Sequence, residues 1–188
     1  MAHRDDRTQL RALLRQHSVR FGEFKLVSGQ TSNVYVDGKL TTYRAEAMPL
    51  VGRLFLRKFH DRGWHPAAVG GLTLGADPIA TAVARESWGT DAQVDAFVIR
   101  KEPKKHGTMK FIEGLASTEG LPVVIIDDVC TTGGSTIAAI ERARESGMRV
   151  LGAVCLVDRE MGAPQNIEAL ACPFDRIFML SELKDDAR

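Results

Sequence analysis

Two adjacent acids stand at the end of an apolar run and directly before a stretch rich in threonine and glycine. The run covers residues 123–126, the acids are Asp127 and Asp128, and the polar stretch covers residues 129–135. Backbone N–H groups of such a turn, at the positive end of a following helix, bind phosphate, and glycines let the backbone approach closely. Carboxylates would repel a phosphate, so we expect them to face sugar hydroxyls or a metal ion. The pattern predicts a sugar-phosphate site.

Other phosphate-binding motifs do not fit this stretch. The sequence has no Gly-x-x-x-x-Gly-Lys-Ser/Thr, and no Gly-x-Gly-x-x-Gly follows an expected strand. These absences argue against a Walker-type nucleotide site and against a dinucleotide fold. The remaining alternative is an ordinary strand-to-helix turn of small residues. Two consecutive acids at the end of a buried strand disfavour that alternative, because ligands bind at the carboxyl ends of strands in open α/β sheets.

This segment resembles a segment of the type I phosphoribosyltransferases. Residues 123–136 are similar to the signature with which that family binds phosphoribosyl pyrophosphate (PRPP). The resemblance implies that the acidic pair contacts ribose hydroxyls and that the turn wraps the 5-phosphate. The PRPP ligands it implies in this segment are Asp127, Asp128, Val129, Cys130, Thr131, Thr132, Gly133, Gly134 and Ser135.

A strongly basic segment, residues 100–110, follows another expected strand and lacks apolar periodicity. By itself such a charge run is typical of a solvated loop. Beside PRPP, however, cations would stabilise the charge that grows on the pyrophosphate leaving group and would exclude water. The segment resembles the catalytic loop of the orotate phosphoribosyltransferases, which implies a homodimer with shared active sites. The working residues so implied, for catalysis and PRPP binding, are Arg100, Lys101, Lys104 and His106.

A second glycine-containing turn covers residues 70–78, between an expected strand and an expected helix. Tight packing alone would account for its glycines. It resembles the pyrophosphate loop of the same family, which implies that backbone N–H groups meet the pyrophosphate from the other side. The residues of this loop are Leu72, Thr73, Leu74 and Gly75.

Further segments resemble the orotate phosphoribosyltransferases in particular, in the right order from about residue 21 to residue 183. Residues 21–37 are similar to the region that covers the base, and residues 156–162 are similar to the segment that supplies an arginine to the orotate carboxylate. The resemblance implies that Arg159 and Thr131 bind orotate. A guanidinium bonds both carboxylate oxygens at once. Without this context, Arg159 would be expected in a surface ion pair with Asp158 or Glu160.

Two positions depart from the family pattern. Many relatives have a lysine where this chain has Val27, and many have a lysine where it has Leu74. Lys25 and Lys39 are the candidates for the missing positive charge. These two differences concern individual contacts with the substrate, and the expected reaction stays the same.

The resemblance implies that orotate and PRPP react to orotidine 5-phosphate and pyrophosphate, a step of pyrimidine synthesis. The transition state is cation-like, so positioning and charge neutralisation replace a protein nucleophile. Mg²⁺ is expected to travel with PRPP and not to sit in a protein cage. A purine or uracil phosphoribosyltransferase, or a PRPP-sensing regulator without catalysis, would share the turn and are the alternatives.

The elements that must position these residues alternate along the chain. Apolar spacing predicts an N-terminal helix ending near Ser18, a hairpin over residues 24–37 and a helix over residues 46–62. Strands are expected at residues 67–69, 94–99, 123–126, 150–157 and 177–180. Asp77 and Ser135 are expected to be helix N-caps, and Gly147 to close the second of these helices.

This order predicts an α/β protein with a mainly parallel twisted sheet flanked by helices. The resemblance implies that this is the type I phosphoribosyltransferase fold. We expect one domain over residues 1–188, in which residues 1–45 contribute a small N-terminal hood.

The composition of the 188 residues is that of an ordinary globular protein, with 44% hydrophobic and 26% charged residues. Lys and Arg number 25 against 24 Asp and Glu, so nothing in the charge asks for nucleic acid or a membrane surface. No apolar run has the roughly 20 residues that span a bilayer. The first residues lack the apolar stretch of a signal peptide, and we expect a cytoplasmic protein. The three widely spaced cysteines indicate reduced thiols and no metal site.

Overall fold

A six-stranded sheet with the order β5-β4-β3-β6-β7-β8 forms the centre of the computed structural model, which describes residues 2–25, 31–102 and 111–184. All neighbouring strands are parallel except β5, which runs antiparallel to β4 at the edge. The strands are β3 (Ala68–Leu72), β4 (Asp95–Ile99), β5 (Ile112–Glu113), β6 (Pro122–Cys130), β7 (Arg149–Asp158) and β8 (Phe174–Met179).

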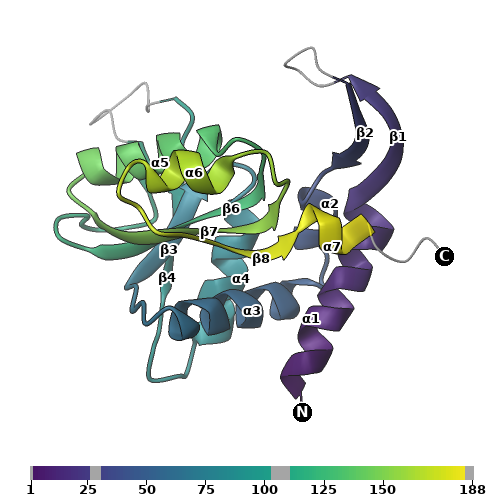
Figure 1. Ribbon diagram of the computed structural model, residues 1–188. Coiled ribbons are helices and arrows are strands. Elements are labelled where there is room, and N and C mark those ends of the chain that lie inside the picture. Colours follow the sequence, from purple (N-terminus) through teal and green to yellow (C-terminus); the bar gives the residue numbers. More distant parts are fainter. Residues whose placement is uncertain (1, 26–30, 103–110, 185–188) are drawn as a thin grey trace.

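Helices cover both faces of this sheet (Figure 1). α5 (Gly134–Glu145) and α6 (Ala163–Glu168) lie on one face, and α3 (Met48–Asp61) and α4 (Asp77–Ser87) lie on the other. Successive side chains of β6 point to opposite faces, so Val123 and Ile125 join the core under α5 and α6, whereas Val124 and Ile126 join the core under α3 and α4. A strand buried on both faces is apolar without alternation, which explains the continuous run that the sequence shows there.

The N-terminal part forms a separate two-stranded sheet. α1 (Ala2–Leu13) continues into a π-helical turn, η1 (Leu14–Ser18), and then into the antiparallel strands β1 (Val19–Lys25) and β2 (Thr31–Val36). We call the β1–β2 pair the hood hairpin; in Figure 1 it projects away from the central sheet. Two short helices, α2 (Lys39–Thr42) and α7 (Leu180–Lys184), lie near its base.

The expected strands and helices all exist, and the main differences concern where elements begin. The N-terminal helical segment ends at Ser18 as predicted. The first hood strand follows at once and begins at Val19, five residues before the expected hairpin. Leu10 and Leu14 of that segment are fully buried, as their spacing predicts. Among the described residues no helix is both long and apolar enough to cross a membrane.

Both predicted N-caps are wrong. The N-cap of α5 is Gly133, which has a φ of 87°, and Ser135 lies inside the first turn. Glycine adopts this left-handed conformation without the penalty that a side chain brings. Asp77 is already the first residue of α4, after the N-cap Ala76, and its carboxylate accepts a hydrogen bond from Thr73 at 2.6 Å. Both helices therefore begin without a side-chain cap, whereas Gly147 follows the end of α5 as expected.

Candidate active site

Asp127 and Asp128 lie at the carboxyl end of β6, and each is only 8% exposed. One Asp127 carboxylate oxygen accepts a hydrogen bond from the Thr136 hydroxyl at 2.9 Å, and the other accepts from the Asp128 backbone N–H at 3.0 Å. Thr136 belongs to α5, so the helix fixes the orientation of this acid. Burial and then the neighbouring charge of Asp128 raise the pKa of Asp127 to about 7, although the bond from Thr136 opposes the rise.

Two segments that are far from Asp128 in the sequence lie against its side chain. A Cβ atom added to Gly38, which follows the hood hairpin, would lie 2.9 Å from the Asp128 carboxylate. A Cβ atom added to Gly75, in the predicted pyrophosphate loop, would lie 2.5 Å from the other Asp128 oxygen. Both distances are too short for carbon and oxygen, so a side chain at either position would force the Asp128 side chain to move. The predicted ribose site and pyrophosphate loop are thereby in direct contact.

Lys39 brings a positive charge to the same place. Its Nζ atom lies 2.8 Å from an Asp37 carboxylate oxygen and 3.7 Å from an Asp128 oxygen. Burial opposes the charged form, but the hydrogen bond to Asp37 and the charge of Asp128 together raise the pKa of Lys39 above its ordinary value. Of the two lysines proposed to supply the missing charge, Lys39 therefore lies beside the acid pair. Val27 and the side chain of Lys25 lie outside the described residues.

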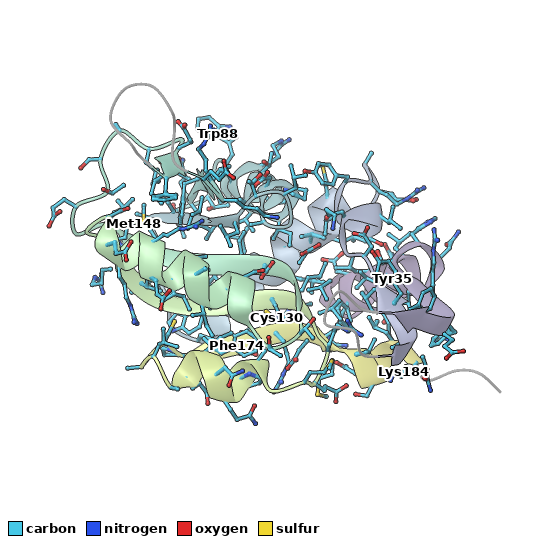
Figure 2. All side chains as sticks on the ribbon, turned by 90° about the horizontal axis from the view of Figure 1, so that it is seen from above. Tyr35, Trp88, Cys130, Met148, Phe174 and Lys184 are labelled. Atoms are coloured by element: carbon cyan, nitrogen blue, oxygen red, sulfur yellow. The ribbon has the colours of Figure 1, made fainter. Side chains whose placement is uncertain are left out.

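The turn between β6 and α5 presents its backbone to solvent. The carbonyl of Gly133 accepts the Ile137 N–H at 2.8 Å, and the Thr132 carbonyl accepts a hydrogen bond from Asn166 at 2.9 Å. Thr132 and Ser135 are exposed, and a Cβ atom added to Gly134 would meet no atom within 4 Å. Hydrogen bonds to its carbonyls therefore hold the turn in place, while its exposed residues leave room for a ligand, as a phosphate site requires. Figure 2 shows the neighbouring Cys130 at the end of α5 nearer Tyr35 of the hood hairpin, with Met148 at the opposite end.

The predicted pyrophosphate loop lies directly after β3. The Thr73 N–H donates to the Ile99 carbonyl at 3.0 Å, which ties this loop to the end of β4. The side chain of Leu74 is 61% exposed, and the Thr73–Leu74 peptide bond is cis. An exposed aliphatic side chain gives no charge for pyrophosphate, and the Thr73 hydroxyl already donates to Asp77, so this loop can contribute backbone N–H groups.

Arg159 connects the end of β7 with the hood hairpin. Its backbone N–H donates to the Cys130 carbonyl at 2.8 Å, and its guanidinium donates to the Val34 carbonyl of β2 at 3.3 Å. The two neighbouring acids bind elsewhere: the buried Asp158 carboxylate accepts from Arg176, and Glu160 accepts the Ser181 N–H at 2.7 Å. The guanidinium therefore lies between the predicted phosphate turn and the hood, where a base would lie.

The basic segment is described only at its two ends. Arg100 and Lys101 follow β4, and the Arg100 N–H donates to the Phe111 carbonyl at 2.9 Å. The Arg100 guanidinium also lies 3.6 Å from a Glu113 carboxylate oxygen. Lys104 and His106 lie outside the described residues, and their catalytic role stays a prediction.

The structure therefore brings the acid pair, the glycine turn and Arg159 to one edge of the sheet. Gly38 is a part of this site that the sequence analysis missed, although a glycine directly after a strand and an aspartate is a turn signal that could have drawn attention to it. The three cysteines are free and buried, as expected. Among the residues that the structure describes, no group of three or more His, Cys, Asp and Glu side chains could hold a metal ion by itself.

A cavity of about 600 Å³ lies away from this edge, where α3 and β8 approach the N-terminal helix. Four of its charged side chains form ion pairs: Arg7 with Glu182 at 2.7 Å, and Lys58 with Asp175 at 3.2 Å. None of the predicted site residues lines it. These ion pairs join elements across the cavity, and the chemistry of the acid pair lies elsewhere.

A family model described as phosphoribosyl transferase domain matches residues 42–170 of the chain. The chain is 42% identical over 178 residues to an orotate phosphoribosyltransferase of Synechocystis sp., and the match covers 95% of this chain and 88% of the relative.

Solved structures of orotate phosphoribosyltransferase from Mycobacterium tuberculosis are similar as well. The complex with Fe(III) dicitrate has a TM-score of 0.83 at 38% identity and is matched over 95% of this chain and 99% of that chain. The complex with PRPP has a TM-score of 0.78 at 35% identity, with 95% and 98% covered.

Proposed function

Since the chain belongs to the phosphoribosyltransferase family, we propose that its activity is that of the orotate phosphoribosyltransferases. It transfers the ribose 5-phosphate group of PRPP to orotate and gives orotidine 5-phosphate and pyrophosphate, a step of pyrimidine synthesis. The observation that carries this conclusion is the likeness to orotate phosphoribosyltransferases over 95% of the chain, at about 40% identity.

We assign the ribose 5-phosphate of PRPP to the acid pair and to the turn that follows it. The backbone N–H groups and hydroxyls from Thr131 to Ser135 would hold the 5-phosphate, in front of the open surface of Gly134. Asp127 and Asp128 would accept hydrogen bonds from the ribose hydroxyls, which fixes the sugar for attack. These acids need no proton transfer, because their task is to orient the ribose.

We assign the base to the space between the turn and the hood hairpin. The Arg159 guanidinium would bind the orotate carboxylate, and Thr131 would contact the ring. The hydrogen bond from Arg159 to the Val34 carbonyl supports this assignment, because it directs the guanidinium toward the strand that covers the base. Uracil has no carboxylate, so the same arginine would favour orotate over uracil.

We assign the leaving group to the residues on the opposite side of the ribose. Backbone groups of residues 72–75 would meet the pyrophosphate, and Arg100, Lys101, Lys104 and His106 would neutralise the charge that it gains as the glycosidic bond breaks. Lys39 adds a further cation beside Asp128. Because the ribosyl group becomes cation-like, no protein nucleophile is needed.

Mg²⁺ fits this site as an ion that PRPP brings with it. Two carboxylates and no third ligand group among the described residues suit an ion that keeps water and phosphate oxygens as its remaining ligands. Asp127 and Asp128 are the residues that would face it. When bound, Mg²⁺ neutralises charge on the pyrophosphate.

We also propose that residues 1–45 form the hood of a single domain and that the protein is a cytoplasmic homodimer. Free buried cysteines suit a reducing compartment. Exposed apolar side chains near the site, Leu40, Tyr43 and Leu74, suit burial against a second copy. In such a dimer the loop of one subunit would act in the other subunit's site.

Mixing two inactive variants tests the shared site. A hybrid of Lys104→Ala and Asp128→Asn subunits contains one site without either change, if the loop acts across the interface. Random exchange of subunits would then restore about one quarter of the wild-type activity. If the mixture stays as inactive as its components while hybrids form, the loop acts within its own subunit.

The function itself is tested by pyrophosphate release from PRPP with Mg²⁺ and single bases. We expect turnover with orotate and none with adenine, hypoxanthine or uracil. Turnover with another base but not with orotate would show that the proposed acceptor is wrong. PRPP binding without turnover on any base would favour a regulator.

A further inference from the structure

One arginine on α5 contacts both ends of the basic segment. The two terminal nitrogens of Arg142 donate to the backbone carbonyls of Arg100 and Lys101, at 2.6 and 3.0 Å. The same guanidinium lies 4.5 Å from the centre of the Phe111 ring. Arg100 and Lys101 are the first residues of the segment (its entry), and Phe111 directly follows it (its exit). The Arg142 side chain therefore holds the entry and the exit together.

A short strand ladder, one backbone hydrogen bond and an ion pair of Arg100 with Glu113 at 3.6 Å also join this entry and exit. β5 has only two residues, and its ladder with β4 pairs Val98 with Glu113 and Ile99 with Ile112. One backbone hydrogen bond, from Arg100 to Phe111, extends that ladder. An edge strand of two residues adds few hydrogen bonds to the six-stranded sheet. The planar guanidinium with its fork of donors suits two successive carbonyls, and its face suits an aromatic ring.

The helix that carries Arg142 also begins at the phosphate turn. α5 starts at Gly134, and Arg142 lies on its third turn, about 12 Å along the axis from the helix start at 1.5 Å per residue. A helix of this length packed on the sheet behaves as a rigid rod. The ends of the basic segment are thus positioned relative to the same element that would bind the 5-phosphate.

We propose that Arg142 is a positioning residue for the reaction: it fixes the entry and the exit of the basic segment on α5, a rigid part of its own subunit, and so places the segment's cations at the pyrophosphate in the site across the dimer interface. The proposal rests on the proposed catalytic role of Lys101, Lys104 and His106. Arg142 itself touches no substrate. Its effect should appear in the catalytic step, because the leaving group gains charge only there.

The same helix provides a matched control. Arg144 also donates to two successive backbone carbonyls, those of Leu170 and Ala171, at 2.9 and 3.4 Å. These residues follow α6 and lie far in sequence from the basic segment. Loss of Arg144 removes the same kind of interaction from the same helix without touching the entry or exit.

The first experiment compares Arg142→Gln, Arg142→Lys and Arg144→Gln by steady-state kinetics and thermal unfolding. We expect Arg142→Gln to lower kcat about tenfold, with the KM for orotate unchanged, because misplaced cations cost rate and not base binding. Arg142→Lys keeps the charge and one donor and should recover part of kcat. Arg144→Gln should keep the wild-type kcat. A loss of kcat in Arg144→Gln equal to that in Arg142→Gln, with an equal fall in Tm, would overturn the proposal.

The second experiment asks whether Arg142 acts through the segment. Lys104→Ala removes much of the segment's contribution, so adding Arg142→Gln to that variant should lower kcat by less than about threefold. A full further tenfold loss would mean that Arg142 acts by another route and would overturn the proposal. Should Arg142→Gln fail to fold, Phe111→Leu removes only the ring under the guanidinium and is expected to lower kcat about threefold; an unchanged kcat there would count against the proposal.

The two proposals fail differently. If the enzyme turns over orotate but Lys104→Ala leaves kcat unchanged, the assignment of the basic segment is wrong. If Lys104→Ala lowers kcat and Arg142→Gln does not, only the role of Arg142 is wrong.

Discussion

The phosphate turn and the cover of the site are built in opposite ways. The turn, residues 127–135, lies within one strand–turn–helix unit, and hydrogen bonds from Thr136 and Asn166 hold it. The cover, which comprises the hood hairpin and the basic segment, depends on contacts from distant residues such as Arg159 and Arg142. The turn is therefore a preformed floor of the site, whereas other elements set the position of the cover. Substitutions in the two regions should therefore change different kinetic constants.

The largest expected effect lies in the cover. Lys104→Ala should lower kcat about a hundredfold, because it removes a cation from the developing charge of the pyrophosphate. The KM for PRPP should change less than kcat does. Steady-state kinetics with orotate and PRPP measures both constants.

Lys58→Ala, at the distant cavity, is the matched control and should leave kcat unchanged. A wild-type kcat in Lys104→Ala would contradict the expectation that substitutions in the cover change the catalytic step.

The next effect concerns the junction of floor and cover. Arg159→Lys keeps the charge but loses the planar pair of donors, so the KM for orotate should rise about thirtyfold. The KM for PRPP should stay within about twofold of wild type. Initial rates with each substrate varied in turn give both values.

Arg62→Lys is a suitable control, because Arg62 stacks on Trp64 away from the site. An equal rise in both KM values for Arg159→Lys would place this arginine in the floor.

A smaller effect is expected from a methyl group added to the floor. Gly134→Ala should raise the KM for PRPP about tenfold, because the methyl group would occupy the space that a phosphate needs. No protein atom lies within 4 Å of that methyl position, and alanine favours a helix, so Tm should not fall. Isothermal titration with PRPP and a thermal melt separate the two expectations. Unchanged PRPP affinity would mean that the 5-phosphate does not bind at this turn.

The smallest expected effect is a pH dependence of stability. The folded protein keeps a proton on Asp127 up to about pH 7, whereas an unfolded chain releases it near an ordinary value of 3.8. The unfolded state binds fewer protons within this window, so wild-type stability falls as pH rises through it. Asp127→Asn removes this loss, and its Tm should gain on the wild type by a few degrees between about pH 4 and pH 7. Parallel melts of the two proteins without PRPP would show no such divergence if Asp127 were ionised throughout.

Sequence reasoning reached the floor of the site more fully than its cover. The acid pair, the turn and the order of strands follow from residues that are neighbours in the chain, and all of them lie where they were predicted. Gly38 and Arg142 were missed, because their roles come from packing against residues about 90 and about 40 positions away. No local pattern distinguishes Arg142 from Arg144. The two helix starts were misplaced because the left-handed Gly133 and Ala76 hold the N-cap positions, so Ser135 and Asp77 already lie inside their helices.

The crowding around Asp128 limits how the molecule can be redesigned or recombined with its relatives. Gly38 and Gly75 come from segments on either side of α3, yet a side chain at either position would displace the Asp128 carboxylate. A chimera that exchanges only one of the three segments would bring together surfaces selected in different proteins. Recombination points are therefore better placed before residue 36 or after residue 136, so that residues 36–39, 72–77 and 126–136 are inherited from one parent.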